Sequence, residues 1–196
     1  MAKAIKTCIV FILILLSQSV FSDTIIPKPG VIHIKKQLTD KPITEKWLYS
    51  NDDNVNFAKN EFDDSKWDTL GSELFEAAFL RVGFTGKGWF RMHLNVDSAF
   101  ANKTYVLTIA QMGASEIYFN GKLVKSIGLY GGVEEDEENG SNDPLYFTPV
   151  AGEQNIFAIR YSNADYLHSY NNTGFLMAGF TATISEPEYH FADVLE

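Results

Sequence analysis

The 196-residue sequence contains a single cysteine, Cys8, so it can form neither an internal disulfide nor a zinc site built from several cysteines. Positive charge is also scarce, because 16 Lys and Arg residues stand against 25 Asp and Glu residues, for a net charge of −9. Nucleic-acid binding depends on Lys and Arg displacing counterions from phosphates, so no nucleic-acid partner is expected. The four histidines lack metal-ligand spacing, which argues against a transition-metal site: His33, His93, His168 and His190.

The sequence also lacks the local motifs of common enzyme classes. It contains no Gly-x-Ser-x-Gly nucleophile elbow, no phosphate-binding glycine loop and no His-Glu-x-x-His helix. Its 25 acidic residues include no pair that the sequence singles out as catalytic. We therefore expect no enzymatic activity in this chain.

Long apolar runs are confined to the N-terminus. Two lysines precede the apolar run Cys8–Leu16, polar residues follow it, and Ser22 is a small residue at the end of the leader. This pattern predicts a signal peptide over residues 1–22 and a periplasmic or otherwise extracytoplasmic location. An uncleaved anchor is the alternative, but the run is shorter than the roughly 20 residues that span a bilayer. Cleavage would remove Cys8 and deepen the net charge to −11.

Helical periodicity is scarce in the rest of the chain. Only Val55–Phe62 and Glu73–Leu80 could hold a turn or two of helix, whereas Trp89–Val96 alternates between apolar and polar residues as a half-buried strand does. Short strands separated by turn residues favour a β-sandwich or barrel. Further β-type runs are Val31–Ile34, Lys46–Tyr49, Thr104–Met112, Glu116–Phe119, Lys122–Ile127, Leu145–Thr148, Asn155–Tyr161 and Gly174–Ile184.

Four short motifs follow one another along the chain. They are Trp47 with the Asn-Asp-Asp of 51–53, FDDSKW at 62–67, GKGWFR at 86–91 and GASEIYFNG at 113–121. In this order they resemble the galactose-binding-like jelly-roll domain at the N-terminus of family 2 glycoside hydrolases. The sequence is more similar still to extracytoplasmic sensor domains of bacterial receptors. In those receptors the domain often precedes seven transmembrane helices and a histidine kinase, cyclase or diguanylate cyclase module.

The resemblance covers about Lys46 to Ser185 and implies an all-β jelly-roll sandwich. The predicted organisation is a signal peptide at 1–22, a linker or strand at 23–43, the galactose-binding-like sandwich at 44–185 and a C-terminal linker at 186–196. The catalytic acids of the resembling hydrolases lie in a different domain. If the parent protein carries a kinase or cyclase, that module would lie beyond residue 196.

Several motif residues are predicted to be structural. Asp and Ser side chains bond nearby backbone amides in turns, so Asp63-Asp64-Ser65 is interpreted as a turn that Trp67 anchors, with a ligand site as the alternative. Asn-Gly between two β runs is typical of a type I′ hairpin turn. The residues assigned to structure are Trp47, Asp63, Asp64, Trp67, Asn120 and Gly121.

Trp89 and Arg91 are the first candidates for ligand binding, because both lie on the polar face of their strand. An arginine beside aromatic rings can bind carboxylates or stack on sugars. The alternative is an internal pair of Arg91 with Asp64 or Glu116.

The stretch Tyr161–Tyr170 is the second candidate. Aromatic rings stack on sugar faces, while Asn, Asp and His bond hydroxyl groups. Loops at one end of jelly-roll binding modules tend to carry the ligand; an ordinary connection whose tyrosines cover the core edge is the alternative. The candidate residues are Tyr161, Asn163, Asp165, Tyr166, His168 and Tyr170.

One segment, residues 131–144, is rich in acids and is predicted to be a mobile loop. Its oxygen atoms would suit calcium, which is the alternative, but the segment lacks the spacing of an EF-hand loop. No other cofactor is expected.

These observations lead to one leading hypothesis and one alternative, with a purely structural domain that packs on a partner protein as a third possibility. The leading hypothesis is a ligand-sensing domain of a bacterial membrane-bound signalling protein that binds a small molecule, with a carbohydrate as the first candidate. Transmembrane and signalling domains would then follow in the parent protein. The alternative is a secreted carbohydrate-binding accessory module of a glycoside hydrolase.

Overall fold

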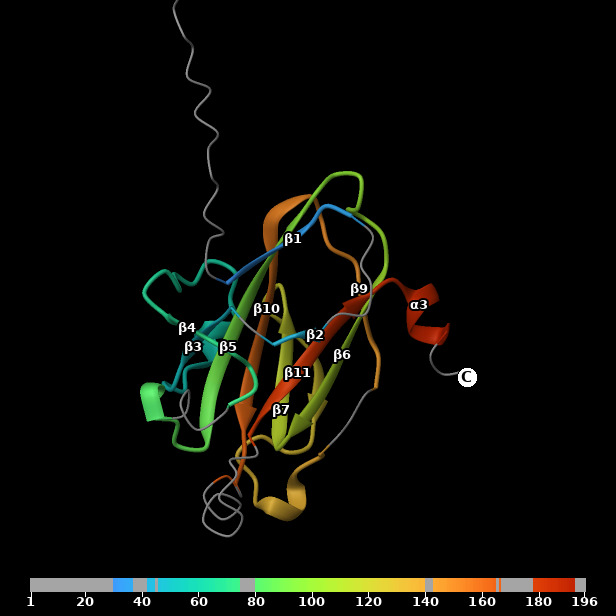
Figure 1. The fold of residues 1–196 in the computed structure, drawn as a ribbon. Helices are drawn as coiled ribbons and strands as arrows, with labels where there is room; N and C mark the ends of the chain where they lie inside the picture. The colour runs from blue at the N-terminus through green and yellow to red at the C-terminus, as the bar shows by residue number, and fades with distance from the viewer. Residues whose placement is uncertain are drawn as a thin grey trace, which may run out of the picture.

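The computed structural model describes residues 30–36, 42–44, 46–74, 80–139, 143–164, 166 and 178–192. Two mainly antiparallel sheets pack face to face, with β11 and β6 of the smaller sheet crossing in front of β5, β10 and β7 of the larger one (Figure 1). The predicted all-β sandwich is therefore confirmed.

The larger sheet has the order β4-β3-β5-β10-β7-β8, and β1 pairs in parallel with β5. Its strands are β1 (Val31–Ile34), β3 (Trp47–Ser50), β4 (Asp68–Leu70), β5 (Lys87–Val96), β7 (Ala114–Phe119), β8 (Lys122–Ile127) and β10 (Gly152–Ser162). The smaller sheet has the order β2-β11-β6-β9 and comprises β2 (Pro42–Ile43), β6 (Tyr105–Met112), β9 (Leu145–Phe147) and β11 (Gly179–Ser185). Short helices are η1 (Val55–Ala58), η2 (Glu134–Asp136) and α3 (Pro187–Ala192).

Every predicted β run contains an observed strand, although the first residues of the run 174–184 lie outside the described part of the chain. Sequence analysis missed β2 and β4, because strands of two and three residues are too short to show a period. The predicted Asn120-Gly121 turn is confirmed, since both residues have positive φ, at 50° and 79°. Two segments were predicted to hold a turn or two of helix. The first, Val55–Phe62, contains η1. The second, Glu73–Leu80, ends at the helical residues 80–82, and its residues 75–79 lie outside the described part of the chain.

The main core lies between the two sheets. The predicted apolar face of β5 points into it, and Phe90 and Leu94 are fully buried. Phe180 on β11 meets the Phe90 ring edge-on at 5.0 Å between ring centroids, and Trp47 meets Phe180 in the same way at 5.1 Å. These aromatic contacts join the two sheets across the core.

The opposite face of β5 is more buried than the sequence predicted. Alternation predicted a half-buried strand, but Trp89 and Arg91 on the polar-looking face are both 0% exposed. The segment that contains η1 folds across this face, and Phe57 and Ala58 form a second apolar cluster with Trp89. A period of two distinguishes the faces of a strand, but it does not show that a further segment will cover the second face.

The domain boundaries at residues 22, 43 and 185 remain predictions. Residues 187–192, within the predicted C-terminal linker, form the short helix α3. Among the described residues, no helix is both long enough and apolar enough to cross a membrane.

Candidate functional site

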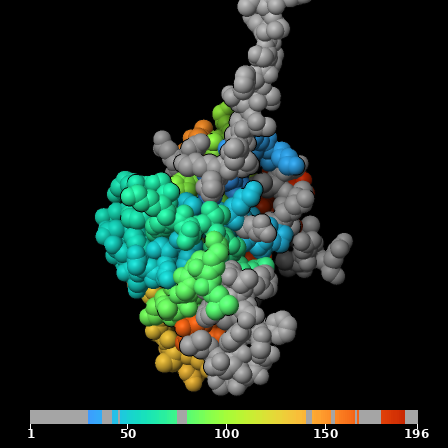
Figure 2. Space-filling view, turned by 60° about the vertical axis from the view of Figure 1, so that its left-hand side comes forward, coloured from blue at the N-terminus to red at the C-terminus, as the bar shows by residue number. Residues whose placement is uncertain are grey.

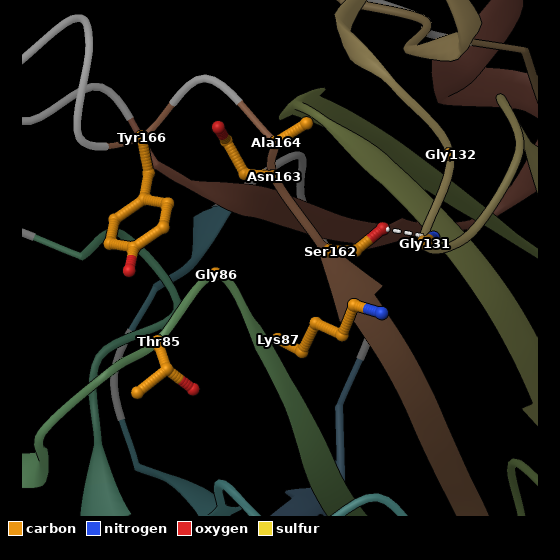
Figure 3. A pocket seen from close by; sticks show the side chains of 9 residues that line it. All are labelled: Thr85, Gly86, Lys87, Gly131, Gly132, Ser162, Asn163, Ala164 and Tyr166. Atoms are coloured by element: carbon orange, nitrogen blue, oxygen red, sulfur yellow. Dashed lines mark hydrogen bonds between the residues drawn. The ribbon is translucent and has the colours of Figure 1, made fainter.

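A cavity of about 150 Å³ opens at one end of the sandwich, where β5 begins and β10 ends (Figure 3). In the space-filling view, the orange end of β10 is visible between the green segment leading into β5 and the yellow region that follows β8 (Figure 2). Three segments distant in sequence therefore converge here. The residues that line the cavity are Thr85, Gly86, Lys87, Gly131, Gly132, Ser162, Asn163, Ala164 and Tyr166.

Hydrogen bonds donated by backbone amides hold the cavity walls together. The Gly131 N–H donates to Ser162 Oγ at 2.8 Å, and the Asn163 N–H donates to the Gly86 carbonyl at 2.9 Å. Gly86 has a φ of 90°, and a Cβ at this position would lie 2.8 Å from a ring carbon of Tyr166. Only glycine therefore lets the Tyr166 ring approach the start of β5 this closely.

Lys87 supplies the cation of the cavity. Its ammonium lies 5.5 Å from the centroid of the Tyr130 ring. Within the described part of the chain, Lys87 forms no ion pair with a carboxylate. Figure 3 shows the ammonium directed toward Ser162 and Gly131. The cavity thus combines one charge with hydroxyl groups and one aromatic ring.

A neighbouring ion-pair cluster fixes the loop that carries Tyr130. Arg160 on β10 approaches Asp53 at 2.7 Å and Glu116 at 3.2 Å, and its guanidinium lies 3.9 Å from the Tyr130 ring centroid. Burial alone would raise the pKa of the Asp53 carboxyl, but the hydrogen bonds and charge of Arg160 outweigh it, so this pKa is lowered. Burial raises the pKa of the Tyr130 phenol to about 12. Tyr130 is thereby held beside Gly131 in the cavity wall.

Arg91 has a structural role, because it bonds three residues of the segment that covers β5. Its Nε lies 2.6 Å from Asp64 Oδ2, and its Nη1 donates to the carbonyls of Phe57 and Lys59. His93 Nε2 lies 2.7 Å from the same Asp64 oxygen. The proposed internal pair of Arg91 is therefore present with Asp64, whereas Glu116 pairs with Arg160. With Arg91 fully buried, it has no surface for a ligand, and Trp89 is buried beside it.

Tyr161 is also part of the scaffold, although the sequence placed it among the ligand candidates. It is 0% exposed, its hydroxyl donates to the Met112 carbonyl, and the same oxygen accepts from the Gly179 N–H at 2.6 Å. Burial raises the pKa of this phenol. Tyr161 joins β10 of the larger sheet to the smaller sheet, because its hydroxyl bonds Met112 on β6 and Gly179 on β11.

Asn163 and Tyr166 are the predicted ligand candidates that line the cavity. The other three residues of that loop, Asp165, His168 and Tyr170, lie outside the described residues. Sequence reasoning missed Thr85, Lys87 and Ser162 as site residues. The GKGWFR motif contained the signal, because it placed a lysine between two glycines at the start of a strand.

The remaining structural motif residues lie as predicted. The Ser65 N–H donates to Asp63 Oδ1 at 3.0 Å, which closes the turn, and Trp67 packs edge-on against Phe57 at 4.9 Å between ring centroids. Trp47 is 2% exposed within the main core.

The acidic segment is anchored to the sandwich near residue 139, within its described part 131–139. The Gly113 N–H donates to Asn139 Oδ1 at 2.7 Å, and the Glu138 N–H donates to the Gly113 carbonyl at 3.1 Å. Composition alone predicted a mobile loop and did not reveal these anchors. Within the described residues, no group of three or more His, Cys, Asp or Glu side chains could hold a metal ion.

No protein-family model and no curated protein sequence matches the chain. Solved structures do match in fold. A glycosyl hydrolase family 2 member from Bacteroides cellulosilyticus aligns with a TM-score of 0.51 at 19% identity, over 76% of this chain and 21% of that protein. Bacteroides uniformis β-glucuronidase 2 aligns with a TM-score of 0.51 at 20% identity, over 76% of this chain and 18% of that protein. The exo-chitosanase CsxA of Amycolatopsis orientalis aligns with a TM-score of 0.50 at 17% identity, over 76% of this chain and 21% of that protein.

The chain shares its fold with one part of each of these proteins. It spans only about a fifth of their length. At this level of identity the likeness concerns the architecture, and function has to be argued from the site.

Proposed function

We propose that this chain is an extracytoplasmic ligand-binding domain of a membrane-bound signalling protein, and that its end cavity binds a small carbohydrate. The cavity carries the proposal, because it brings hydroxyl groups, a lysine and a tyrosine ring together at one end of a rigid sandwich. Rings that stack on a sugar face and polar groups that bond its hydroxyls are the components of a carbohydrate site.

The size of the cavity limits the ligand. At about 150 Å³ it is smaller than the roughly 300–1,000 Å³ of typical ligand sites. It therefore suits one sugar ring, either a free monosaccharide or the end residue of a longer glycan. The signal-peptide pattern at residues 1–22 supports export to a compartment where such ligands occur.

The second candidate function is a carbohydrate-binding accessory module of a glycoside hydrolase. The fold shared with parts of glycoside-hydrolase structures favours it. The two candidates predict different sequences in the parent gene beyond residue 196. Transmembrane helices with a kinase or cyclase module would support the signalling role, whereas a catalytic barrel would support the accessory role.

Replacing Thr85 by valine is expected to weaken sugar binding about 3- to 10-fold. The substitution keeps the shape of the side chain but removes a hydroxyl at the cavity, and a neutral hydrogen bond contributes about 0.5–1.5 kcal/mol. Isothermal titration of the exported domain against a panel of neutral and acidic monosaccharides measures the affinity.

Thr108→Val is the matched control, because Thr108 is half-buried on β6 of the smaller sheet and does not line the cavity. A saturating sugar should also raise the free energy of unfolding by about 2.7 kcal/mol at a hundred times its Kd. If no sugar in the panel binds, or if both threonine variants lose affinity equally, the proposed site is wrong.

A further inference from the structure

We infer that the ligand of the end cavity is an acidic sugar, and that Lys87 selects it by binding its anionic group. This inference rests on the proposed carbohydrate function and adds the charge of the ligand. The starting observation is an exposed ammonium that lines the cavity and pairs with none of the described carboxylates, in a chain of net charge −9.

Arg160 is a second cation near this end of the sheet, and two carboxylates already neutralise its charge. Arg160 lies two residues before Ser162 on β10, and it pairs with both Asp53 and Glu116. Lys87 faces Ser162 across the β5–β10 register but makes only a cation–π contact with Tyr130. Among the described residues that line the cavity, Lys87 therefore supplies a positive charge that no carboxylate neutralises.

Two acids of the nearby loop accept hydrogen bonds from backbone amides. Asp136 Oδ2 accepts from the Val133 N–H at 3.2 Å, and Glu137 Oε1 accepts from the Ala164 N–H. These bonds keep the two carboxylates engaged at the rim of the cavity, and neither forms an ion pair with Lys87. An acidic ligand thus competes with no established partner for the ammonium.

The cavity also supplies a second donor beside the ammonium. Ser162 Oγ accepts from the Gly131 N–H, so its own hydroxyl proton can be donated to a ligand oxygen. Gly131 has no side chain to cover Lys87, and a Cβ built there would lie 3.0 Å from Nζ. Lys87 and Ser162 can therefore meet the two oxygens of one carboxylate, while the sugar ring extends toward Tyr166 (Figure 3).

The test compares paired sugars that differ in one carboxylate. Glucuronate and galacturonate are titrated against glucose and galactose, with acetate and sulfate as anions that carry no sugar ring. We expect the wild-type domain to prefer the acidic sugar roughly 10- to 100-fold, because charge-assisted hydrogen bonds are about twice as strong as neutral ones. The preference should shrink as salt is added, because screening weakens an exposed ion pair.

Lys87→Met should abolish this preference by weakening binding of the acidic sugar far more than binding of the neutral sugar. Lys122→Met is the matched control, since Lys122 is an exposed lysine on β8 and lies away from the cavity. Gly131→Ala should also weaken binding of the acidic sugar. Its control is Gly152→Ala, which has a comparable positive φ of 92° but no atom within 4 Å of the added Cβ.

Each outcome separates this inference from the proposed function. Equal binding of acidic and neutral sugars, unaffected by Lys87→Met, would overturn the inference and leave the carbohydrate function standing. Acetate or sulfate binding as tightly as the acidic sugars would show an anion site and overturn the carbohydrate function. Binding of no sugar at all would overturn both.

Discussion

Replacing Asp64 by alanine is expected to lower the free energy of unfolding by about 3–5 kcal/mol. The substitution removes the carboxylate that lies 2.6 Å from Nε of Arg91, a residue with 0% exposure. Breaking one partner of a buried ion pair leaves the other charge buried without compensation, and this cost dominates. Urea denaturation of the wild-type and variant domains measures the difference.

An exposed ion pair provides the control for this experiment. Asp143 lies 3.5 Å from Lys125, and its side chain is 77% exposed, so Asp143→Ala should cost no more than about 1 kcal/mol. If Asp64→Ala proves as mild as Asp143→Ala, the Arg91 network does not hold the η1 segment on the sheet.

The same carboxylate should make stability depend on pH in the acid range. Burial raises the pKa of Asp64, but the hydrogen bonds and charges of His93 and Arg91 outweigh it, so its pKa in the folded protein lies below the ordinary value of about 3.9. Its stabilising contribution is therefore complete above that value and is lost as pH falls through the lowered pKa.

An Asp64→Asn variant tests this dependence. It should be less stable than wild type at neutral pH, and the two free energies of unfolding should converge as the pH falls below the ordinary carboxyl pKa of about 3.9 and through the lowered pKa of Asp64. Asp143→Asn should instead follow the wild-type curve. Parallel curves for wild type and Asp64→Asn would show that Asp64 does not titrate as described.

Replacing Gly113 by alanine is the second large change, with an expected loss of about 2–5 kcal/mol in the free energy of unfolding. Gly113 has a φ of 119°, where an L-residue is strained by about 1–2 kcal/mol, and its Cβ would overlap the Ser162 carbonyl oxygen. That oxygen belongs to the backbone of β10 and cannot rotate away, so overpacking adds roughly 1–3 kcal/mol. Thermal and urea unfolding both report the loss.

Gly152→Ala separates the two contributions to this loss. Gly152 has a φ of 92°, but a Cβ there meets no atom within 4 Å, so only the backbone strain of about 1–2 kcal/mol remains. Equal losses for the two variants would mean that the contact with Ser162 costs nothing. Because Ser162 lines the cavity, Gly113→Ala should also weaken ligand binding, whereas Gly152→Ala should not.

The candidate site could be predicted from sequence only in part. The tyrosine-rich stretch after β10 indicated the correct end of the sandwich, because Asn163 and Tyr166 line the cavity. Lys87 and Gly131 were not predicted, since they are separated from that stretch by long spans of sequence and no motif links them. Trp89 and Arg91 were ligand candidates with an internal pair of Arg91 as the alternative, because a polar strand face looks the same in sequence whether solvent or another segment covers it.

The sequence by itself determined the class of fold. The all-β sandwich was predicted from local features of the sequence. These are the alternation of apolar and polar residues, turn signals such as Asn120-Gly121, and four ordered motifs. Only the tertiary structure decided which polar residues are scaffold and which face a ligand. Arg91 and Lys87 lie four residues apart on one strand, yet the first is fully buried against Asp64 and the second opens into the cavity. The difference comes from the η1 segment, which covers this face of the strand at Trp89 and Arg91, whereas Lys87 at the start of the strand lines the cavity.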